Sequence, residues 1–360
     1  MIIVHVAEYA SGGVATYLRN LISEQLNDER VEKVILINSN YNSESFDFHS
    51  SKFINAEFDY KRSIIGIFKL LSIRKIIDSY DPDVVHYHSS FAGLVRFTYF
   101  VKSAKYKVIY CAHGWSFNKE DISKIKKWIF KVIEMILSIK TSTIINISKD
   151  EQEKSIQLGL PIDKMYLIYN SIPSKIEYHE IVNPYENDKE CKKILFIGRF
   201  DKQKGLDFLL KNIDFEEYNI ELVMIGGSVL ESNEPVALPR NVKSVGWVEN
   251  NLIDSYIKFC DAVIVPSRWE GFGLVALEAC KNSKMVIASD VGGLPEIVRN
   301  GFNGLVFKSE SIEMLNDVIS KFHEMSKDRI KLMGINGRKL FDNKYNYEKL
   351  YNRLMDIYII

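Results

Sequence analysis

Short apolar runs rich in β-branched residues alternate along this chain with longer segments of helical period. In the first half these runs, and the amphipathic segments between them, occupy residues 2–6, 14–26, 34–37, 63–80 and 84–88. The same alternation returns between residues 194 and 288. Parallel strands joined by crossover helices produce this pattern, because their sheets are covered on both faces. The sequence therefore predicts an α/β protein with two parallel sheets.

A polar segment separates the two α/β halves. Residues 177–192 hold Pro184 within a mixture of Asn, Asp, Glu and Lys, and we interpret them as the linker. A length of 360 residues fits this division, since it exceeds the usual span of one hydrophobic core. After residue 338 the chain is aromatic and amphipathic at helical spacing, which predicts a terminal helix packed on a core. The pattern alone leaves open which core that is.

Composition and charge exclude several classes of protein. The 47 Lys and Arg residues balance 47 Asp and Glu, so no overall field attracts nucleic acid and we expect no nucleic-acid partner. The four cysteines are far apart in the sequence, which argues against a zinc or disulfide framework and favours a reducing compartment. The start lacks the pattern of a signal peptide, and no apolar run approaches the ~20 residues of a membrane span. We expect a cytoplasmic protein, either free or lying on a membrane.

The densest candidate for a ligand site is a turn at residues 266–278, where a predicted strand leads into a helix. Unpaired amides and the helix dipole favour a phosphate at such a helix start, and Gly271 and Gly273 let a ligand approach the main chain. Glu270 and Glu278 lie on either side of the turn, and carboxylates accept strong hydrogen bonds from sugar diols. The alternative is that Glu270 complements the helix dipole and that Glu278 lies on a solvated face.

A second candidate element lies at residues 194–205. Here a predicted strand ends in Gly198 and Arg199, and Lys204 follows just before another helix. Parallel sheets bind ligands beyond the carboxyl ends of their strands, where two cations suit a diphosphate. Arg and Lys in loops are usually only solvated. This element therefore indicates a diphosphate site only in combination with the glutamate turn.

Together these motifs resemble the donor-binding half of retaining GT-B glycosyltransferases, specifically family 4 of the group 1 type, which includes bacterial surface-polysaccharide enzymes. The resemblance rests on the Gly-Arg…Lys-Gly element and on the spacing of Glu270 and Glu278, with seven residues between them. It also rests on the string Ser-Asp-Val-Gly-Gly-Leu-Pro-Glu at residues 289–296.

The first half is similar to the family as well, through a glycine loop at residues 8–14 and through His86, His88 and His113 at strand ends. The resemblance implies the GT-B fold, with two Rossmann-like domains that face a cleft. The acceptor would bind the first domain and the nucleotide sugar the second. The implied bounds are 1–182 for the first domain, 183–340 for the second, and 341–360 for a terminal helix that crosses back onto the first.

The resemblance also implies a role for each matching residue. Arg199 and Lys204 would neutralise the donor diphosphate as charge develops on the leaving phosphate, and Glu278 would bind the ribose hydroxyls. The groups implied to hold the transferred sugar and the distal phosphate are Glu270 and the amides of Gly271, Phe272, Gly273 and Leu274. The groups implied in the first domain are Gly12 and Gly13, at the diphosphate, and His113, near the anomeric carbon. A structural role stays open for His113, and for at least one of His86 and His88.

Retention of configuration normally involves a carboxylate nucleophile. The family is instead described by attack of the acceptor hydroxyl on the face that the diphosphate leaves, so we expect no general base, no metal and no cofactor. The string Asp81-Pro82-Asp83 could hold a metal in the other large glycosyltransferase fold, but here it precedes a strand, and Pro82 suits a strand entry. The Gly-Gly pair after Ile225 lacks the dinucleotide-binding fingerprint. Trp247 is interpreted either as a wall of the nucleobase site or as core.

Basic charge is concentrated in the first half. Residues 51–150 hold 17 Lys and Arg against 9 Asp and Glu. Within them, residues 61–75 and 123–131 have the pattern of cationic amphipathic helices, and the second places Trp128 among lysines. Basic residues beside an exposed Trp suit the surface of an anionic bilayer. We expect peripheral binding to the inner face of the cell membrane, with a merely solvated face as the alternative.

The sequence thus predicts a retaining hexosyl- or N-acetylhexosaminyltransferase. Its donor would be a nucleotide diphosphate sugar, most plausibly UDP-linked, and its acceptor a polyprenyl-diphosphate-linked glycan in capsule, O-antigen or exopolysaccharide assembly. One alternative is a GT-B nucleotide-sugar epimerase, and another is a non-catalytic subunit that binds the nucleotide and recruits a partner transferase. The set Arg199, Lys204, Glu270 and Glu278 disfavours both.

Overall fold

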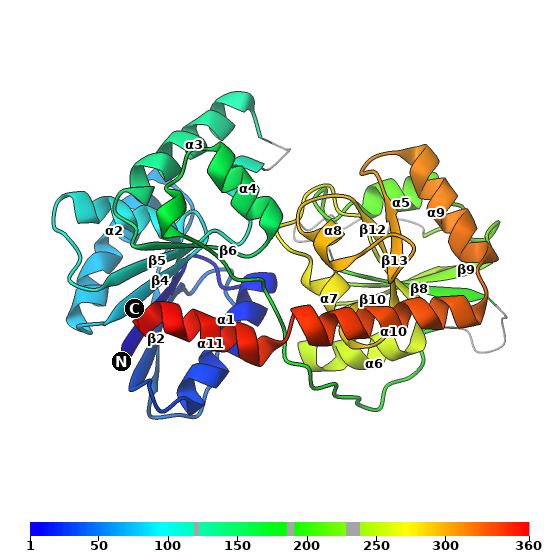
Figure 1. The fold of residues 1–360 in the computed structure, drawn as a ribbon, viewed down its shortest axis with the longest axis horizontal. Coiled ribbons are helices and arrows are strands. Elements are labelled where there is room, and N and C mark those ends of the chain that lie inside the picture. Colours follow the sequence, from blue (N-terminus) through cyan, green and yellow to red (C-terminus); the bar gives the residue numbers. More distant parts are fainter. Residues whose placement is uncertain (119–121, 186–190, 228–237, 360) are drawn as a thin grey trace. The chain divides into compact units, whose positions relative to one another are not determined.

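The computed structural model describes residues 1–118, 122–185, 191–227 and 238–359, and Figure 1 shows its fold. The chain forms two compact units. Unit 1 comprises Met1–Asn170 together with Glu348–Ile360, and unit 2 comprises Ser171–Tyr347. Within the described residues, no helix combines the length and the apolarity that crossing a bilayer requires.

Unit 1 is built around a parallel sheet of seven strands among the residues described, in the order β3-β2-β1-β4-β5-β6-β7. The strands are β1 (Ile2–Ala7), β2 (Lys33–Ser39), β3 (Phe53–Phe58), β4 (Val84–His88), β5 (Lys107–Cys111), β6 (Thr143–Asn146) and β7 (Met165–Leu167). The helices are α1 (Gly13–Asn27), α2 (Ile64–Ser79), η1 (Ala92–Phe100), η2 (Ser116–Asn118), α3 (Lys124–Ser138), α4 (Lys149–Gln157) and η3 (Ile162–Lys164).

The strand order of unit 1 reverses at its centre, where β1 pairs with β2 on one side and with β4 on the other. In this register His5 of β1 lies beside His86 of β4. The carboxyl ends of strands at such a reversal are where open α/β sheets bind ligands. The buried histidines His5, His86 and His88 therefore lie in the two strands that flank this reversal.

The end of the chain belongs to unit 1, as the fold prediction required. Helix α11 (Tyr347–Ile359) buries Tyr351, Leu354, Met355, Ile357 and Tyr358. Its Tyr358 hydroxyl lies 2.6 Å from Nδ1 of His86, and its Tyr351 hydroxyl donates to Oδ2 of Asp28 over 2.8 Å. The aromatic residues at helical spacing thus form the face by which the last helix packs against the first sheet.

Unit 2 is built around a second parallel sheet, of six strands among the residues described, in the order β10-β9-β8-β11-β12-β13. The strands are β8 (Lys192–Ile197), β9 (Ile220–Ile225), β10 (Val242–Gly246), β11 (Ala262–Val265), β12 (Met285–Ser289) and β13 (Gly304–Phe307). The helices are α5 (Leu206–Asn212), η4 (Asn250–Leu252), α6 (Ile253–Phe259), α7 (Leu274–Lys281), α8 (Leu294–Ile297), α9 (Ile312–Glu324) and α10 (Lys327–Lys344). The predicted α/β architecture with two Rossmann-like sheets is confirmed.

Candidate active site

The turns after β8, β11 and β12 meet at the carboxyl edge of the second sheet, and they touch through their main chains. Gly292 has a φ of +56°, and a Cβ there would lie 1.8 Å from the carbonyl oxygen of Glu270. Gly205 has a φ of +68°, and a Cβ there would lie 2.0 Å from the carbonyl oxygen of Pro266. Only glycine fits either position, since both the backbone conformation and the space exclude a side chain. The glutamate turn is thus fixed from both neighbouring turns.

An ion pair joins the two motifs that the sequence singled out. Nζ of Lys204 donates to Oε2 of Glu270 over 2.6 Å, and the Ser267 hydroxyl donates to the same oxygen over 3.3 Å. The Lys204 and Glu270 side chains keep exposed fractions of 20% and 12%. The pair is therefore partly shielded from water, and its ammonium group remains within reach of an anionic ligand.

Arg199 lies at the same edge without touching Glu270. Its Nη2 donates to Oε1 of Gln203 over 2.9 Å and lies 3.0 Å from Oδ2 of Asp201. Gln203 in turn donates through Nε2 to the carbonyl oxygen of Trp269 over 3.2 Å. Gln203 therefore links the Arg199 guanidinium to the glutamate turn, a connection that the sequence analysis missed.

Helix α7 begins at Leu274, and its N-cap residue Gly273 has a left-handed φ of +102°. This conformation turns the chain sharply from Glu270 and Gly271 into the helix, so that Phe272 is buried while the main chain of the turn remains at the sheet edge. Glu278 lies one turn into α7, and burial raises its pKa to about 7, although Lys281 and Lys204 act in the opposite direction. The two glutamates therefore differ, since one is paired with a cation and the other is poised between its charged and neutral forms.

Arg268 holds the glutamate turn in place and was not foreseen from the sequence. Its guanidinium donates to both carboxylate oxygens of Asp207, at 2.7 and 2.9 Å, to Glu310 over 2.7 Å, and to the carbonyl oxygen of Lys202 over 2.7 Å. These partners occupy its donors, so Arg268 is a structural residue. Nothing in the sequence distinguishes Arg268, directly before Trp269, from Arg199, the arginine predicted to bind the donor.

Histidines gather at the carboxyl edge of the first sheet, where Glu8, directly after β1, is paired with Arg62 over 2.5 Å. His113 follows β5 with a left-handed φ of +51°, and its Nε2 lies 2.9 Å from Nδ1 of His88. Burial lowers the pKa of His113 to about 4, so the imidazole is neutral at physiological pH. His86 and His88 are completely buried, and burial lowers the pKa of both.

Glu151 accepts a hydrogen bond from the main chain next to His113. The sequence analysis did not identify this residue. One of its carboxylate oxygens accepts from the amide of Ile147 over 3.1 Å, and a backbone hydrogen bond also comes from Gly114, the neighbour of His113. Burial raises its pKa to about 7. The signal was present, because Ser148 and Glu151 have the spacing of a capping box, and the Ser148 hydroxyl caps α4.

The glycine loop of unit 1 already has an anionic partner. The amide of Gly12 donates to Oε1 of Glu44 over 2.7 Å, and Glu44 also accepts from Arg19 over 2.6 Å. Gly12 has a φ of +57° and no atom within 4 Å of a Cβ position, so the main chain of the loop is open on that side. Gly13 is the first residue of α1.

Other candidates have simple structural explanations. The Asp83 carboxylate accepts from the amide of Ile2 over 2.7 Å, so it closes the start of β1. Trp247 is 63% exposed, which removes the core interpretation and leaves the nucleobase wall as a hypothesis. Among the described residues, the one group with ligand atoms spaced for a metal ion is His5, His86 and His88, all buried.

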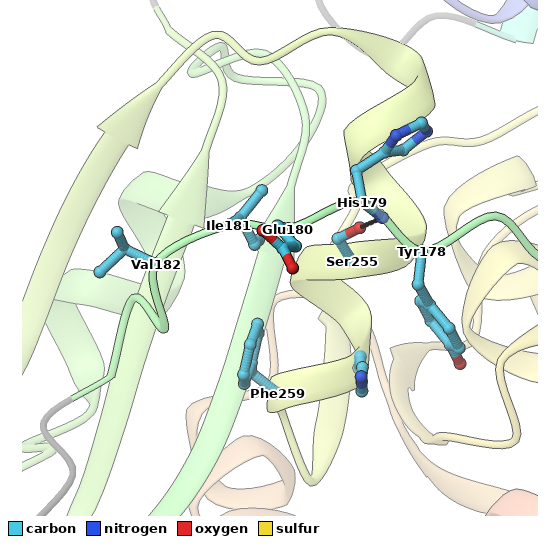
Figure 2. A pocket seen from close by; sticks show the side chains of 8 residues that line it. Tyr178, His179, Glu180, Ile181, Val182, Ser255 and Phe259 are labelled. Carbon is cyan, nitrogen blue, oxygen red and sulfur yellow. Dashed lines mark hydrogen bonds between the residues drawn. The ribbon is translucent and has the colours of Figure 1, made fainter.

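A cavity of about 610 Å³ lies elsewhere in unit 2, beside α6. Figure 2 shows the segment from Tyr178 to Val182 running alongside the helix that carries Ser255 and Phe259. The amide of His179 donates to the Ser255 hydroxyl over 2.7 Å, which ties the segment to α6. None of the predicted site residues lines this cavity, so it is separate from the candidate active site.

Two Rossmann-like parallel sheets, with a phosphate-suited helix start and a cation–carboxylate pair at the edge of the second, define the class of GT-B glycosyltransferases. Residues 11–175 match the family described as Glycosyltransferase Family 4, and residues 177–340 match Glycosyl transferases group 1. The chain belongs to this family of glycosyltransferases, which confirms the resemblance seen in the sequence.

Known relatives match most or all of the chain. The chain is 33% identical to an uncharacterized 41.2 kDa protein in the cps region of Klebsiella pneumoniae, with 99% of each covered. It is 24% identical to UDP-Gal:alpha-D-GlcNAc-diphosphoundecaprenol alpha-1,3-galactosyltransferase of Escherichia coli, with 83% of the chain and 79% of the relative covered.

Solved structures show the same fold. Sucrose-phosphate synthase from Thermosynechococcus elongatus is similar with a TM-score of 0.82 at 18% identity, covering 99% of this chain and 98% of the other. Anabaena HepE in complex with UDP-glucose is similar with a TM-score of 0.76 at 16% identity, covering 99% of both chains. At these identities the likeness carries the fold and no more.

Proposed function

We propose that this glycosyltransferase moves a sugar, with retention of anomeric configuration, from a UDP-linked donor to a lipid-linked saccharide during surface polysaccharide assembly. The observation that carries the proposal is the partly shielded Lys204–Glu270 pair, held at the glycine turn that opens α7. The Lys204 ammonium group offers a partner for phosphate, and the Glu270 carboxylate offers one for sugar hydroxyls. The galactosyltransferase relative is named for a UDP-Gal donor and a diphosphoundecaprenol-linked acceptor, and this supports a UDP-linked donor and a lipid-linked acceptor here.

In this proposal the bond between the anomeric carbon and the phosphate oxygen breaks, and its electron pair leaves on the nucleoside diphosphate. The acceptor oxygen forms the new bond on the same face, and its proton passes to the leaving phosphate oxygen. Lys204 and Arg199 stabilise the negative charge that develops there. The amides of Gly271 to Leu274 and the carboxylate of Glu270 orient the distal phosphate and the sugar.

The remaining groups position the donor and the sugar. Glu278 accepts hydrogen bonds from the ribose hydroxyls when its carboxyl is ionised. Gly12 and Gly13 offer main chain to the diphosphate, in competition with Glu44, and His113 contacts the transferred sugar through a neutral imidazole. In this scheme the chain needs neither a carboxylate nucleophile nor a metal ion.

Transfer of a labelled sugar tests this function directly. The protein is incubated with UDP-glucose, UDP-galactose or UDP-N-acetylglucosamine and a polyprenyl-diphosphate-linked N-acetylglucosamine, and the product linkage is determined by NMR. We expect transfer from one donor with an α-anomer formed from an α-donor. Epimerised nucleotide sugar would instead favour the epimerase, and tight UDP binding without turnover on any lipid acceptor would favour the non-catalytic subunit.

The proposal includes docking of unit 1 on an anionic bilayer through α3. This helix exposes Ile125, Trp128 and Ile129, with exposed fractions of 72%, 64% and 44%. Lys124 and Lys126 are exposed on the same helix. Exposed apolar side chains flanked by lysines suit the interface of an anionic membrane, because the rings and chains enter the headgroup region while the ammonium groups meet phosphates.

The way in which α3 is attached explains why its apolar face points outward. The helix buries Glu134, which binds Arg96 over 2.8 Å and accepts from the Tyr110 hydroxyl over 2.7 Å. Burial of this polar side of the helix leaves Ile125 and Ile129 without cover from unit 1.

Co-sedimentation with vesicles tests the docking. Vesicles with one third phosphatidylglycerol should bind the protein, and pure phosphatidylcholine vesicles should bind it weakly. The double variant Ile125→Ser and Trp128→Ser should lose most of this binding, whereas Leu332→Ser, at an exposed apolar residue of unit 2, should not. Equal binding by both variants would remove α3 from the proposal.

A further inference from the structure

A continuous hydrogen-bonded chain runs from α1 to His113 through the first sheet. Oε1 of Gln25 lies 2.8 Å from Nε2 of His5, Nδ1 of His5 lies 3.0 Å from Nε2 of His88, and Nδ1 of His88 lies 2.9 Å from Nε2 of His113. Gln25, His5 and His88 are each completely buried. A chain of four polar side chains inside an otherwise apolar sheet layer is costly unless every link is satisfied.

The chain has a direction, because an amide oxygen only accepts. The structure turns Oε1 of Gln25 toward His5 and leaves the Gln25 Nε2 buried without a hydrogen-bond partner among the described residues. In this orientation Nε2 of His5 carries the proton that Gln25 accepts. A neutral imidazole has one proton, so Nδ1 of His5 accepts from Nε2 of His88, and Nδ1 of His88 accepts from Nε2 of His113. Burial supports the neutral state, since it lowers the pKa of His5 to about 4 and also lowers that of His88.

The groups around this chain do not supply a competing charge. The Tyr17 ring of α1 lies edge-on to His113 with centroids 4.7 Å apart, and also neighbours His88. His86 stands beside His5 and His88, and its Nδ1 is engaged by the Tyr358 hydroxyl of α11. No carboxylate or ammonium group is hydrogen-bonded to the chain among the residues described, so its polarity is set at the Gln25 end.

We propose that Gln25, His5 and His88 are positioning residues that hold His113 in its neutral Nε2–H tautomer, so that its Nδ1 is the acceptor for a hydroxyl of the bound sugar. The inference deepens the proposed function and rests on the role of His113 in it. The opposite tautomer of His113 would set two lone pairs face to face at His88. The chain therefore selects a substrate that offers a hydrogen-bond donor to this nitrogen, as a sugar hydroxyl does.

His5 and His88 of the chain, together with His86, also have ligand atoms at the spacing of a metal site. Nε2 of His86 is buried and has no hydrogen-bond partner among the described residues. A metal ion at these atoms would displace the protons that join His5 to His88. The two arrangements are thus exclusive, and the metal content of the purified protein distinguishes them.

Nitrogen NMR on protein labelled with ¹⁵N-histidine tests the chain without any substrate. At pH 7 we expect His5, His88 and His113 each to carry the proton on Nε2 alone. In Gln25→Leu and in Gln25→Met, which preserves the length of the side chain, His113 should become a mixture of tautomers, and Gln25→Glu should restore the single form. An Nδ1–H form of His113 in the unmodified protein, an unchanged tautomer in Gln25→Leu and Gln25→Met, or one equivalent of bound zinc would each overturn the inference.

Sugar transfer supplies the second readout. With UDP-sugar as donor, kcat should fall roughly 3- to 30-fold in Gln25→Leu while KM for the donor changes little, and Gln25→Glu should recover most of it. If the unmodified protein transfers no sugar, the proposed function fails and the NMR result still stands. If transfer occurs but its rate is indifferent to Gln25 despite the tautomer change, the link from the chain to the sugar is wrong.

Discussion

Each unit contains a short ion pair with Glu, and the two pairs have opposite surroundings. Arg96 and Glu134 in unit 1 are 0% and 5% exposed, and the guanidinium also donates to the Gly93 carbonyl oxygen and the Thr141 hydroxyl. In unit 2, the Lys204 and Glu270 side chains are 20% and 12% exposed. The first pair is enclosed by protein partners, whereas the second is open at a glycine turn.

This difference separates a structural pair from one that can bind a ligand. Each of the three guanidinium nitrogens of Arg96 donates to a protein group, and the guanidinium lies 3.6 Å from the Tyr110 ring centroid. Because the side chain is also 0% exposed, no ligand can reach it. Lys204 has three N–H donors and remains accessible. An ion pair thus indicates a ligand site only when one of its members can still bind a further partner.

The largest effect should follow removal of the enclosed cation. Arg96→Met leaves Glu134 buried without its partner, and we expect a loss of about 3–5 kcal/mol in the free energy of unfolding. The midpoint of urea unfolding measures it. Lys321→Met breaks an exposed helical pair with Asp317 and should cost less than about 0.5 kcal/mol. Similar losses for the two variants would show that the enclosed pair is not special.

Removal of the open cation should affect turnover more than stability. Lys204→Ala should lower kcat/KM for the UDP-sugar by about 100- to 1,000-fold, because one stabilising charge at the leaving phosphate is lost. Its melting temperature should stay within a few degrees of the unmodified protein. Lys202→Ala removes an exposed charge two residues away and should retain activity. Full activity in Lys204→Ala would remove this residue from the mechanism.

The main-chain support of Glu270 can be tested at glycine. Gly292→Ala places a methyl group against the Glu270 carbonyl oxygen as well as straining a left-handed φ, and should cost about 2–4 kcal/mol. Gly301 has a φ of +75° and no atom within 4 Å of a Cβ position. Gly301→Ala should therefore lose only about 1 kcal/mol of stability, from backbone strain alone. Chemical unfolding of both variants separates contact from strain, and equal losses would contradict the close approach.

The smallest effect is a pH dependence at Glu278. Burial raises its pKa from 4.5 to about 7 in the folded protein, so the folded state binds the extra proton between these values. Stability from this group is therefore fully present below about pH 4.5 and is lost as the pH rises through about 7. Glu278→Gln should remove this loss and stabilise the ligand-free protein at pH 8 by about 1–2 kcal/mol, with little change at pH 5. Unfolding midpoints at the two pH values measure the difference, and a variant with the same pH dependence would refute the assignment.

The candidate site residues of unit 2 could be predicted from the sequence because they lie close together in it. Glu270 and Glu278 flank one turn, and Arg199 and Lys204 flank another, so spacing and a strand–turn–helix pattern suffice. Gln203 and Arg268 could not be found in this way. Their roles depend on which turns become neighbours in the sheet, and Arg268 meets Asp207 and Glu310 from distant segments.

The amphipathic helices also show that the sequence pattern does not determine which residues become neighbours in space. Helices α3 and α9 both carry apolar residues at helical spacing. Helix α9 buries its apolar stripe, namely Leu315, Val318, Ile319 and Phe322. Helix α3 instead buries Glu134 and exposes Ile125, Ile129 and Ile136. A pattern of period 3.6 fixes which residues share a face, and only the neighbours in space decide which face is covered.

The sequence by itself determined the two parallel sheets, the family and the charged residues of the second sheet edge, because these follow from local periodicity and short spacings. The tertiary structure alone decided that His5, His88 and His113 form one chain with Gln25, since these residues come from β1, β4, α1 and the end of β5. Parallel pairing brings such distant segments together, and no spacing along the chain encodes it.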